Sequence, residues 1–307
     1  MKYILILGLV LLSTSCKPQN AKNKNMDELD KKIEEIVNYA TKNLPDYANM
    51  DKLPDLYNIM ISSSNCRYQI LINDLLNTSF LDDSEGHISS KSKGINSSLL
   101  VSGTTPIEIR LLPPTGKKTL DKYASISVKI EHIPHLGNAE GRKIIWTYEM
   151  PMLDYPLPRF IHKDVFEVTV PFEIKDLENA TDLTTLDTKQ LKKEVHEQFA
   201  VFEDILRRGD GIALLEITRE RERRSSIKWY STKEEIKKSR LKFVERTQKS
   251  TLLPLPEPKL ELYGNGKLAT LRNAKTLEAY FWMDDGDYYF GRTLYVYKTK
   301  DGKWHVW

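Results

Sequence analysis

The spacing of apolar residues changes partway along the chain from a strand period to a helix period, and this change limits the possible folds. Between residues 56 and 174, apolar and polar residues alternate in several short segments, which predicts half-buried strands. The clearest of these segments are residues 67–74, 95–103, 107–112, 125–130 and 165–170. Gly, Pro and Asn clusters separate them, as turns do. We therefore expect an antiparallel β-sandwich over residues 56–175.

The second half of the chain begins with a helical period. Residues 189–208 repeat apolar side chains at three- and four-residue spacing, which predicts an amphipathic helix that ends at Gly209. Residues 212–224 are helical by composition, although their apolar spacing also allows a strand, and residues 232–247 predict another helix. A polar linker is expected over residues 176–187.

Strand-like segments with turn signals follow the proline-rich residues 253–258. Gly264-Asn265-Gly266 and Lys300-Asp301-Gly302-Lys303 are typical of hairpin turns. The sequence therefore predicts an α+β protein of several domains, in which the sandwich is followed by a domain over residues 189–307 with helices on an antiparallel sheet.

Charge and cysteine content exclude several classes of protein. The 46 Lys and Arg residues nearly balance the 43 Asp and Glu residues, so the chain lacks the basic surplus of a dedicated nucleic-acid binder. Its two cysteines cannot form a four-thiolate zinc site or a disulfide-rich scaffold. We expect no nucleic-acid partner and no cofactor.

The first sixteen residues have the pattern of an export signal. Lys2 precedes an apolar run over residues 4–12, and Ser13-Thr14-Ser15 leads to Cys16. Nine apolar positions are too few for a membrane-spanning helix. The segment resembles the lipobox of bacterial lipoproteins, although Ser13 stands where that family prefers Leu. The resemblance implies a signal peptide over residues 1–15, a lipid on Cys16 and, from Lys17, a place on the periplasmic side of the outer membrane.

The N-terminal region also allows a second interpretation. The chain could be an ordinary secreted protein in which Cys16 is incidental. After Cys16, residues 16–25 are polar and predict a flexible tether, and residues 26–50 predict an N-terminal helix. With Cys16 lipidated, Cys66 has no partner in the chain, and we interpret it as a small buried side chain.

The last hairpin contains Asp301-Gly302-Lys303-Trp304 and follows a helix-then-sheet order. This combination resembles nuclear-transport-factor-like cone domains, which implies a curved sheet but no particular activity. Aromatic residues on such a sheet could line a cleft for a carbohydrate or a peptide, or they could be core. The candidates for ligand contact are Tyr280, Trp282, Tyr289, Tyr295, Tyr297 and Trp304.

Three polar features are candidate sites. His132 and His135 could bind a metal, but Pro134 prevents the helical spacing that would align them, so exposed loop histidines are the alternative. Residues 284–287 could form a calcium loop or a charged hairpin. Residues 216–249 hold twelve basic and six acidic residues and could bind an anion or a membrane surface, but their alternating signs favour a solvated helix face.

The sequence contains no nucleophile elbow, phosphate-binding glycine loop or zinc-protease motif. We therefore expect a lipid-anchored binding protein of the cell envelope rather than an enzyme, with a protein or carbohydrate ligand and a membrane contact through its lipid. An immunity or inhibitor role in the periplasm fits this description. A hydrolase or metal-dependent enzyme and a structural envelope component are the alternatives.

Lipidation gives the first testable prediction. Cells that express the protein with radiolabelled palmitate should incorporate the label into the wild type and not into Cys16→Ala, because the acyl chains depend on that sulfur. Cys66→Ala is the matched control and should be labelled normally. Label that persists in Cys16→Ala contradicts the lipoprotein interpretation.

Overall fold

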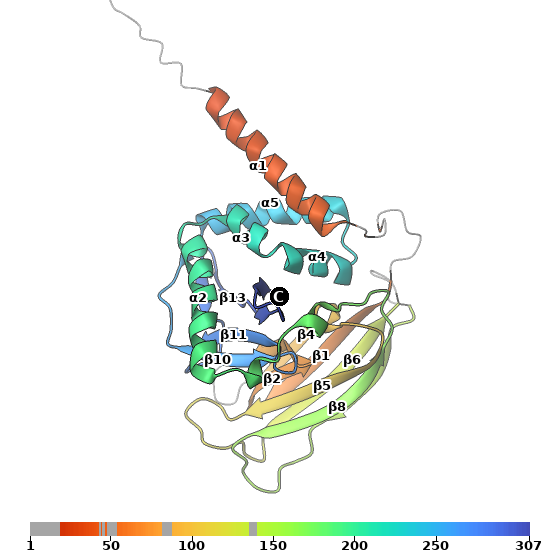
Figure 1. Cartoon of the computed structure of the whole chain (residues 1–307). Helices are drawn as coiled ribbons and strands as arrows, with labels where there is room; N and C mark the ends of the chain where they lie inside the picture. Colours follow the sequence, from red (N-terminus) through yellow and green to blue (C-terminus); the bar gives the residue numbers. More distant parts are fainter. Residues whose placement is uncertain (1–18, 43, 45–46, 48–53, 82–87, 135–139) are drawn as a thin grey trace, which may run out of the picture.

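The computed structural model describes residues 19–42, 44, 47, 54–81, 88–134 and 140–307 (Figure 1). Within these residues the chain is a mixed α and β protein, with five α-helices and four antiparallel sheets. Residues 1–18, which include the predicted signal peptide and Cys16, lie outside the described residues. The helices are α1 (Gln19–Ala40), α2 (Thr188–Arg207), α3 (Gly211–Ile217), α4 (Arg219–Lys228) and α5 (Lys233–Lys249).

Residues 56–168 form two four-stranded antiparallel sheets, with strand orders β4-β1-β6-β7 and β3-β2-β5-β8. Both sheets contribute to one apolar core, in which Ile59, Ile70, Ile109 and Val128 are fully buried. The alternation of the sequence thus corresponds to inward-facing and outward-facing side chains. The strands are β1 (Leu56–Ser64), β2 (Arg67–Ile72), β3 (Leu75–Phe80), β4 (Ile88–Gly94), β5 (Gly103–Leu112), β6 (Ser125–Ile133), β7 (Lys143–Glu149) and β8 (Phe160–Val168).

The C-terminal half contains the other two sheets, with strand orders β10-β11-β14-β15 and β13-β12-β9. The apolar face predicted for residues 189–208 is confirmed, because α2 buries Phe199, Phe202 and Leu206 against this half. Both predicted hairpin turns connect paired strands. The strands are β9 (Thr251–Leu252), β10 (Pro258–Tyr263), β11 (Leu268–Asn273), β12 (Phe281–Asp284), β13 (Tyr289–Arg292), β14 (Val296–Lys298) and β15 (Trp304–Val306).

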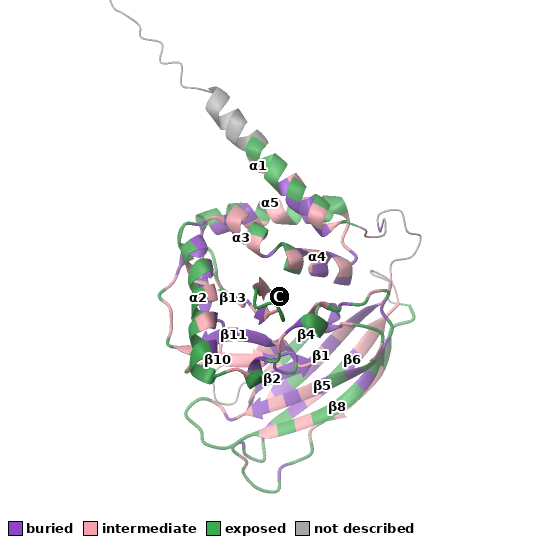
Figure 2. Ribbon diagram, viewed as in Figure 1, coloured by how far each residue is buried: buried purple, intermediate pink, exposed green. Residues whose placement is uncertain are grey.

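The helices α3, α4 and α5 form a helical layer of the C-terminal half, and α1 packs on this layer although it precedes the sheets in sequence. Ile33, Val37 and Ala40 of α1 are fully buried against Leu215 of α3 and Val244 of α5. Figure 2 shows buried residues where α1 meets this layer and exposed ones where it extends beyond it. Helix α1 therefore shares an apolar core with α3 and α5, which lie more than 170 positions later in the chain.

Three local predictions differ from the structure. The predicted tether is helical from Gln19 onward, since residues 19–25 contain no Gly or Pro to interrupt a helix. The predicted helix over residues 26–50 ends at Ala40. The predicted strand over residues 95–103 is wrong up to residue 102, since Gly103 begins β5: a short 3-10 helix, η2 (Asn96–Ser98), follows β4, and Asn96 Oδ1 accepts a hydrogen bond from the backbone of Tyr57 at 3.0 Å.

The predicted linker is also structured. It contains two 3-10 helices, η3 (Asp176–Asn179) and η4 (Leu183–Thr185), and it buries Leu177 and Leu183. Leu177 packs with Leu71 of β2 and Tyr263 of β10, so apolar contacts join the strand-rich half to the C-terminal half. Leu177 and Leu183 hold this segment in place because each covers an apolar surface.

The core of the C-terminal half gives a stability prediction. Phe281→Ala on β12 should lower the free energy of unfolding by about 3–5 kcal/mol, because Phe281 is fully buried and its loss leaves a cavity. Tyr289→Ala on the neighbouring β13 is the control and should change it by less than about 0.5 kcal/mol, since Tyr289 is 68% exposed. Urea denaturation measures both, and equal losses would contradict the assigned core.

Candidate functional site

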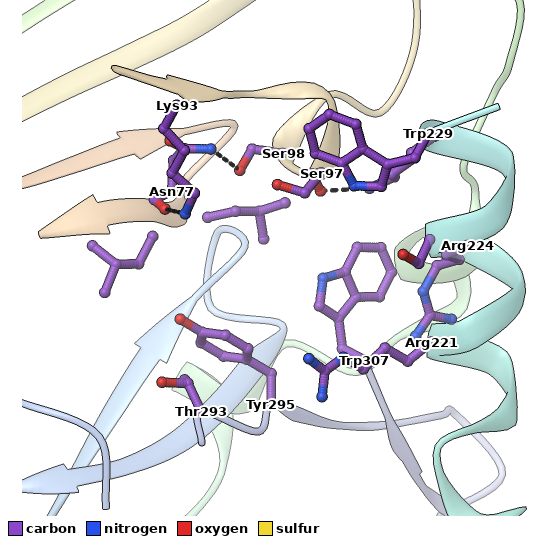
Figure 3. Close-up of a pocket in the computed structure, with 14 residues that line it drawn as sticks. Asn77, Lys93, Ser97, Ser98, Arg221, Arg224, Trp229, Thr293, Tyr295 and Trp307 are labelled. Carbon is purple, nitrogen blue, oxygen red and sulfur yellow. Dashed lines mark hydrogen bonds between the residues drawn. The ribbon is translucent and has the colours of Figure 1, made fainter. Parts of the chain in front are cut away.

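A cavity of about 340 Å³ lies where α4, the strand-rich half and the C-terminal half meet (Figure 3). We call it the α4 cavity. The first half supplies side chains from β3, β4 and η2, and the second supplies them from α4 and from the segments around β14 and β15. Its lining residues are Leu75, Leu76, Asn77, Lys93, Ser97, Ser98, Arg221, Arg224, Ser225, Lys228, Trp229, Thr293, Tyr295 and Trp307.

The helical spacing of α4 places three cations on one face. Arg221, Arg224 and Lys228 are three and four residues apart, so their side chains project in the same direction, toward the cavity. Arg223 lies off this face and forms ion pairs with Glu220 at 3.2 Å and with Asp176 at 3.6 Å. The alternating charges of the sequence therefore separate into a paired face and a cationic face.

Arg224 is a buried cation that is only partly paired. It is 3% exposed, and its Nη2 donates to the backbone oxygen of Val306 at 2.9 Å. Its guanidinium carbon lies 4.3 Å from the centre of the Trp307 ring, a cation–π contact. Its Nη1 has no hydrogen-bond partner, and Asp176 Oδ2 lies 3.8 Å from it. One nitrogen of the guanidinium is thus buried without a hydrogen-bond acceptor.

Lys228 is the second buried cation and is also 3% exposed. Its Nζ donates to the backbone oxygen of Ser97 at 2.9 Å and lies 5.5 Å from the Trp307 ring centre. Burial and the positive charge of Arg224 lower the pKa of Lys228 to about 7, although Asp176 partly opposes this. Near neutral pH, a nearby negative charge would favour the protonated amine.

Two further cations and several neutral groups complete the lining. Lys93 Nζ donates to the backbone oxygen of Asn77 at 2.5 Å, and Arg221 is exposed at the edge of the cavity. Asn77 Nδ2 donates to Ser98 Oγ at 3.1 Å, while Asn77 Oδ1 is buried without a hydrogen-bond partner. The α4 side of the cavity therefore holds three cations, whereas the strand side holds Lys93 among neutral groups.

Aromatic side chains form part of the wall. Arg272 Nη2 donates to the hydroxyl oxygen of Tyr295 at 3.1 Å. Trp229 packs so closely on Gly94 that a Cβ atom there would lie 2.4 Å from the indole ring, so this contact requires a glycine. Trp307 packs against Arg224 and Lys228 as described above.

The lining of the α4 cavity has an excess of positive charge. Four of its side chains are basic, and none of the described residues that line it is an Asp or a Glu. The carboxylate of Asp176 approaches Arg224 from outside the lining. In a site that is partly shielded from water, such a charge excess attracts anions more strongly than it would on an exposed surface.

The structure does not bring the six predicted aromatic ligand contacts together, because they belong to two separate sheets and their connections. Of the six, Tyr295 lines the α4 cavity. Tyr297 is 5% exposed in the contact between the halves, and Tyr280 packs on Phe199 with ring centres 6.0 Å apart. Trp304 Nε1 donates to Glu194 at 3.0 Å. Trp282 is partly buried in β12, and Tyr289 is exposed on β13.

The predicted metal ligands are only partly described. His132 lies on β6 instead of an exposed loop, and its Nε2 is 2.7 Å from Asp55 Oδ2, while its ring lies against Tyr57. His135 lies outside the described residues. Within the described part of the chain, no three or more His, Cys, Asp and Glu side chains are grouped as metal ligands would be.

Two other predicted features have simple structural roles. Cys66 is buried with its Sγ 3.5 Å from the Ser125 backbone oxygen, and burial raises the pKa of its thiol to about 11. It is therefore protonated at neutral pH, as expected of a small buried side chain. Residues 285–288 connect β12 to β13, and Asp285 pairs with Arg246 at 2.6 Å, so this segment is a charged hairpin.

The sequence contains a signal for the cations of α4 but none for the residues of the strand-rich half that line the same cavity. The basic surplus of residues 216–249 and the spacing of Arg221, Arg224 and Lys228 were visible, but sign alternation indicated a solvated face. Lys93 and Asn77 carry no comparable pattern, because they reach the cavity only when the two halves pack together.

Lys228 gives a prediction about stability and pH. In the unfolded chain its pKa is about 10.4, so between pH 7 and 9 the unfolded state binds more protons than the folded state. Raising the pH from 7 to 9 should therefore stabilise the protein through this group, by on the order of 2 kcal/mol.

Urea denaturation at several pH values measures this contribution as the difference between the wild type and Lys228→Met. The wild type should gain stability relative to Lys228→Met as the pH rises. Lys238→Met, on the exposed face of α5, is the control and should follow the wild type. Parallel pH profiles for wild type and Lys228→Met would show that Lys228 titrates normally.

Comparisons with known proteins do not identify the chain. No protein-family model, curated protein or solved structure matches it. Among the described helices, none combines the length and the apolar character needed to cross a membrane. The chemistry of the α4 cavity is therefore the basis for a function.

Proposed function

We propose that this protein is a lipid-anchored binding protein of the cell envelope and that it binds a small anionic ligand in the α4 cavity. The observation that carries the proposal is the pair of buried cations, Arg224 and Lys228, on the wall of a cavity whose described lining contains no Asp or Glu side chain. Asp176 supports Arg224 from outside the lining at 3.8 Å, a distance too long for a hydrogen bond.

The energetics favour an anion over a neutral ligand. Removing a cation from water costs several kcal/mol unless an opposite charge and hydrogen bonds offset the loss. An anion between Arg224 and Lys228 could supply the acceptor that Nη1 of Arg224 lacks and would favour protonation of Lys228. A volume of about 340 Å³ lies at the lower end of the range for small-molecule sites.

The wider architecture is part of the same proposal. The shared core of the two N-terminal sheets supports a β-sandwich module. The antiparallel strands and the packing of α2 support a C-terminal α+β module, which we continue to compare with nuclear-transport-factor-like cone domains. The signal-like N-terminus and Cys16 support anchoring at the envelope, on the periplasmic side of the outer membrane.

A protein partner, as in an immunity or inhibitor role, is the second candidate. One observation favours it: β7 and β8 each lie at the end of a sheet and carry exposed apolar side chains. Ile144, Ile161 and Val165 are 45%, 40% and 49% exposed. Exposed apolar residues on edge strands are typical of surfaces that pair with another chain.

Calorimetric titration of the full chain with inorganic phosphate and with sulfate tests anion binding. Saturable binding of either anion should weaken about tenfold or more in Arg224→Met and in Arg221→Gln, since each removes a cation from the cavity. Arg221 is exposed, so its variant should fold even if Arg224→Met does not.

Lys238→Gln is the matched control, because it removes one positive charge from the exposed face of α5 and should bind like the wild type. Absence of saturable binding by the wild type contradicts the proposal. So does an affinity that falls equally in Lys238→Gln and Arg221→Gln, because that result would indicate attraction by the overall charge.

A further inference from the structure

The α4 cavity has two chemically different sides, and an anion would satisfy only one of them. On the α4 side, Arg221, Arg224 and Lys228 offer positive charge and N–H donors. On the strand side, the lining includes the amide of Asn77 and the hydroxyl of Ser98, and the Nζ of Lys93 there already donates to the backbone oxygen of Asn77. A ligand that combines a charged end with a neutral, hydrogen-bonding end would suit both sides of the cavity.

Asn77 specifies what the neutral end must offer. Its side chain is held by the hydrogen bond from its Nδ2 to Ser98 Oγ, and the residue is 5% exposed. Its Oδ1 is buried and accepts no hydrogen bond from the protein. A buried carbonyl oxygen without a donor costs about 1–3 kcal/mol, so a ligand hydroxyl that donates to it would recover this loss.

The aromatic wall favours a ligand with a carbon framework over a bare inorganic anion. Trp229, Tyr295 and Trp307 contribute to the same lining as the cations and Asn77. Figure 3 shows Tyr295 and Trp307 near Arg221 and Arg224, with Asn77 on the opposite side of the cavity. Aromatic faces combine apolar contact area with fixed geometry, which suits the C–H surfaces of a sugar ring.

We infer that the ligand of the α4 cavity is a phosphate ester of a monosaccharide, and this inference rests on the anion binding proposed above. The phosphate would lie between Arg224 and Lys228, and a sugar hydroxyl would donate to Asn77 Oδ1. The ring would occupy the aromatic wall. The volume of about 340 Å³ suits one sugar unit better than an oligosaccharide.

Calorimetric titration of the full chain with glucose 6-phosphate, inorganic phosphate, glucose and adenosine monophosphate tests this ligand class. Glucose 6-phosphate should bind at least tenfold more tightly than inorganic phosphate, and glucose alone should bind more weakly than either. Adenosine monophosphate is a fourth probe, and tighter binding of this nucleotide than of glucose 6-phosphate overturns the inference.

Asn77→Leu separates the sugar contact from the anion contact. It should weaken the binding of glucose 6-phosphate about tenfold more than that of inorganic phosphate, because it removes the acceptor but no cation. Asn58→Leu is the matched control: Asn58 on β1 also donates to a serine hydroxyl, that of Ser92, outside the cavity. This variant should bind both probes like the wild type.

Monodeoxy analogues of glucose 6-phosphate test the same hydrogen bond without changing the protein, should Asn77→Leu fail to fold. At least one analogue should lose about tenfold in affinity. Equal affinities for inorganic phosphate and for all the sugar phosphates overturn this inference but leave anion binding intact. If no anion binds, both proposals fail.

Discussion

The two buried cations of α4 connect the parts of the molecule that surround the cavity. Lys228 donates to the backbone of Ser97 in the strand-rich half, and Arg224 donates to the backbone of Val306 next to the C-terminus. The same helix packs against α1 in the helical layer. Because one short helix makes all of these contacts, its position determines both how the two halves meet and where the cavity lies.

Apolar packing holds the two halves together beside the cavity. Leu71 and Leu75 from the strand-rich half pack against Tyr263 and Leu268 from the C-terminal half. Walls that are held in this way need little reordering when a ligand enters, which preserves affinity. The charged cavity beside this apolar contact is locally unfavourable for folding, and such local conflicts are typical of functional sites.

Much of the secondary structure could be predicted from the sequence. The helix α2 and the hairpin turns at Gly264 and Gly302 depend on residues a few positions apart, so their patterns are readable. The segment after β4 has a strand-like pattern but is not a strand, because the hydrogen bond from the Tyr57 backbone to Asn96 Oδ1 joins residues 39 positions apart. The six aromatic residues predicted to contact a ligand do not share one face, because they belong to two sheets and their connections.

The sequence by itself determined the strand and helix periods, the predicted export signal and the cationic spacing on α4. Only the tertiary structure decided that this cationic face turns inward. The contacts that hold it there join residues 131 positions apart for Lys228 with Ser97 and 82 positions apart for Arg224 with Val306. A periodic pattern reports which side chains share a face, but the surface that meets this face comes from distant parts of the chain.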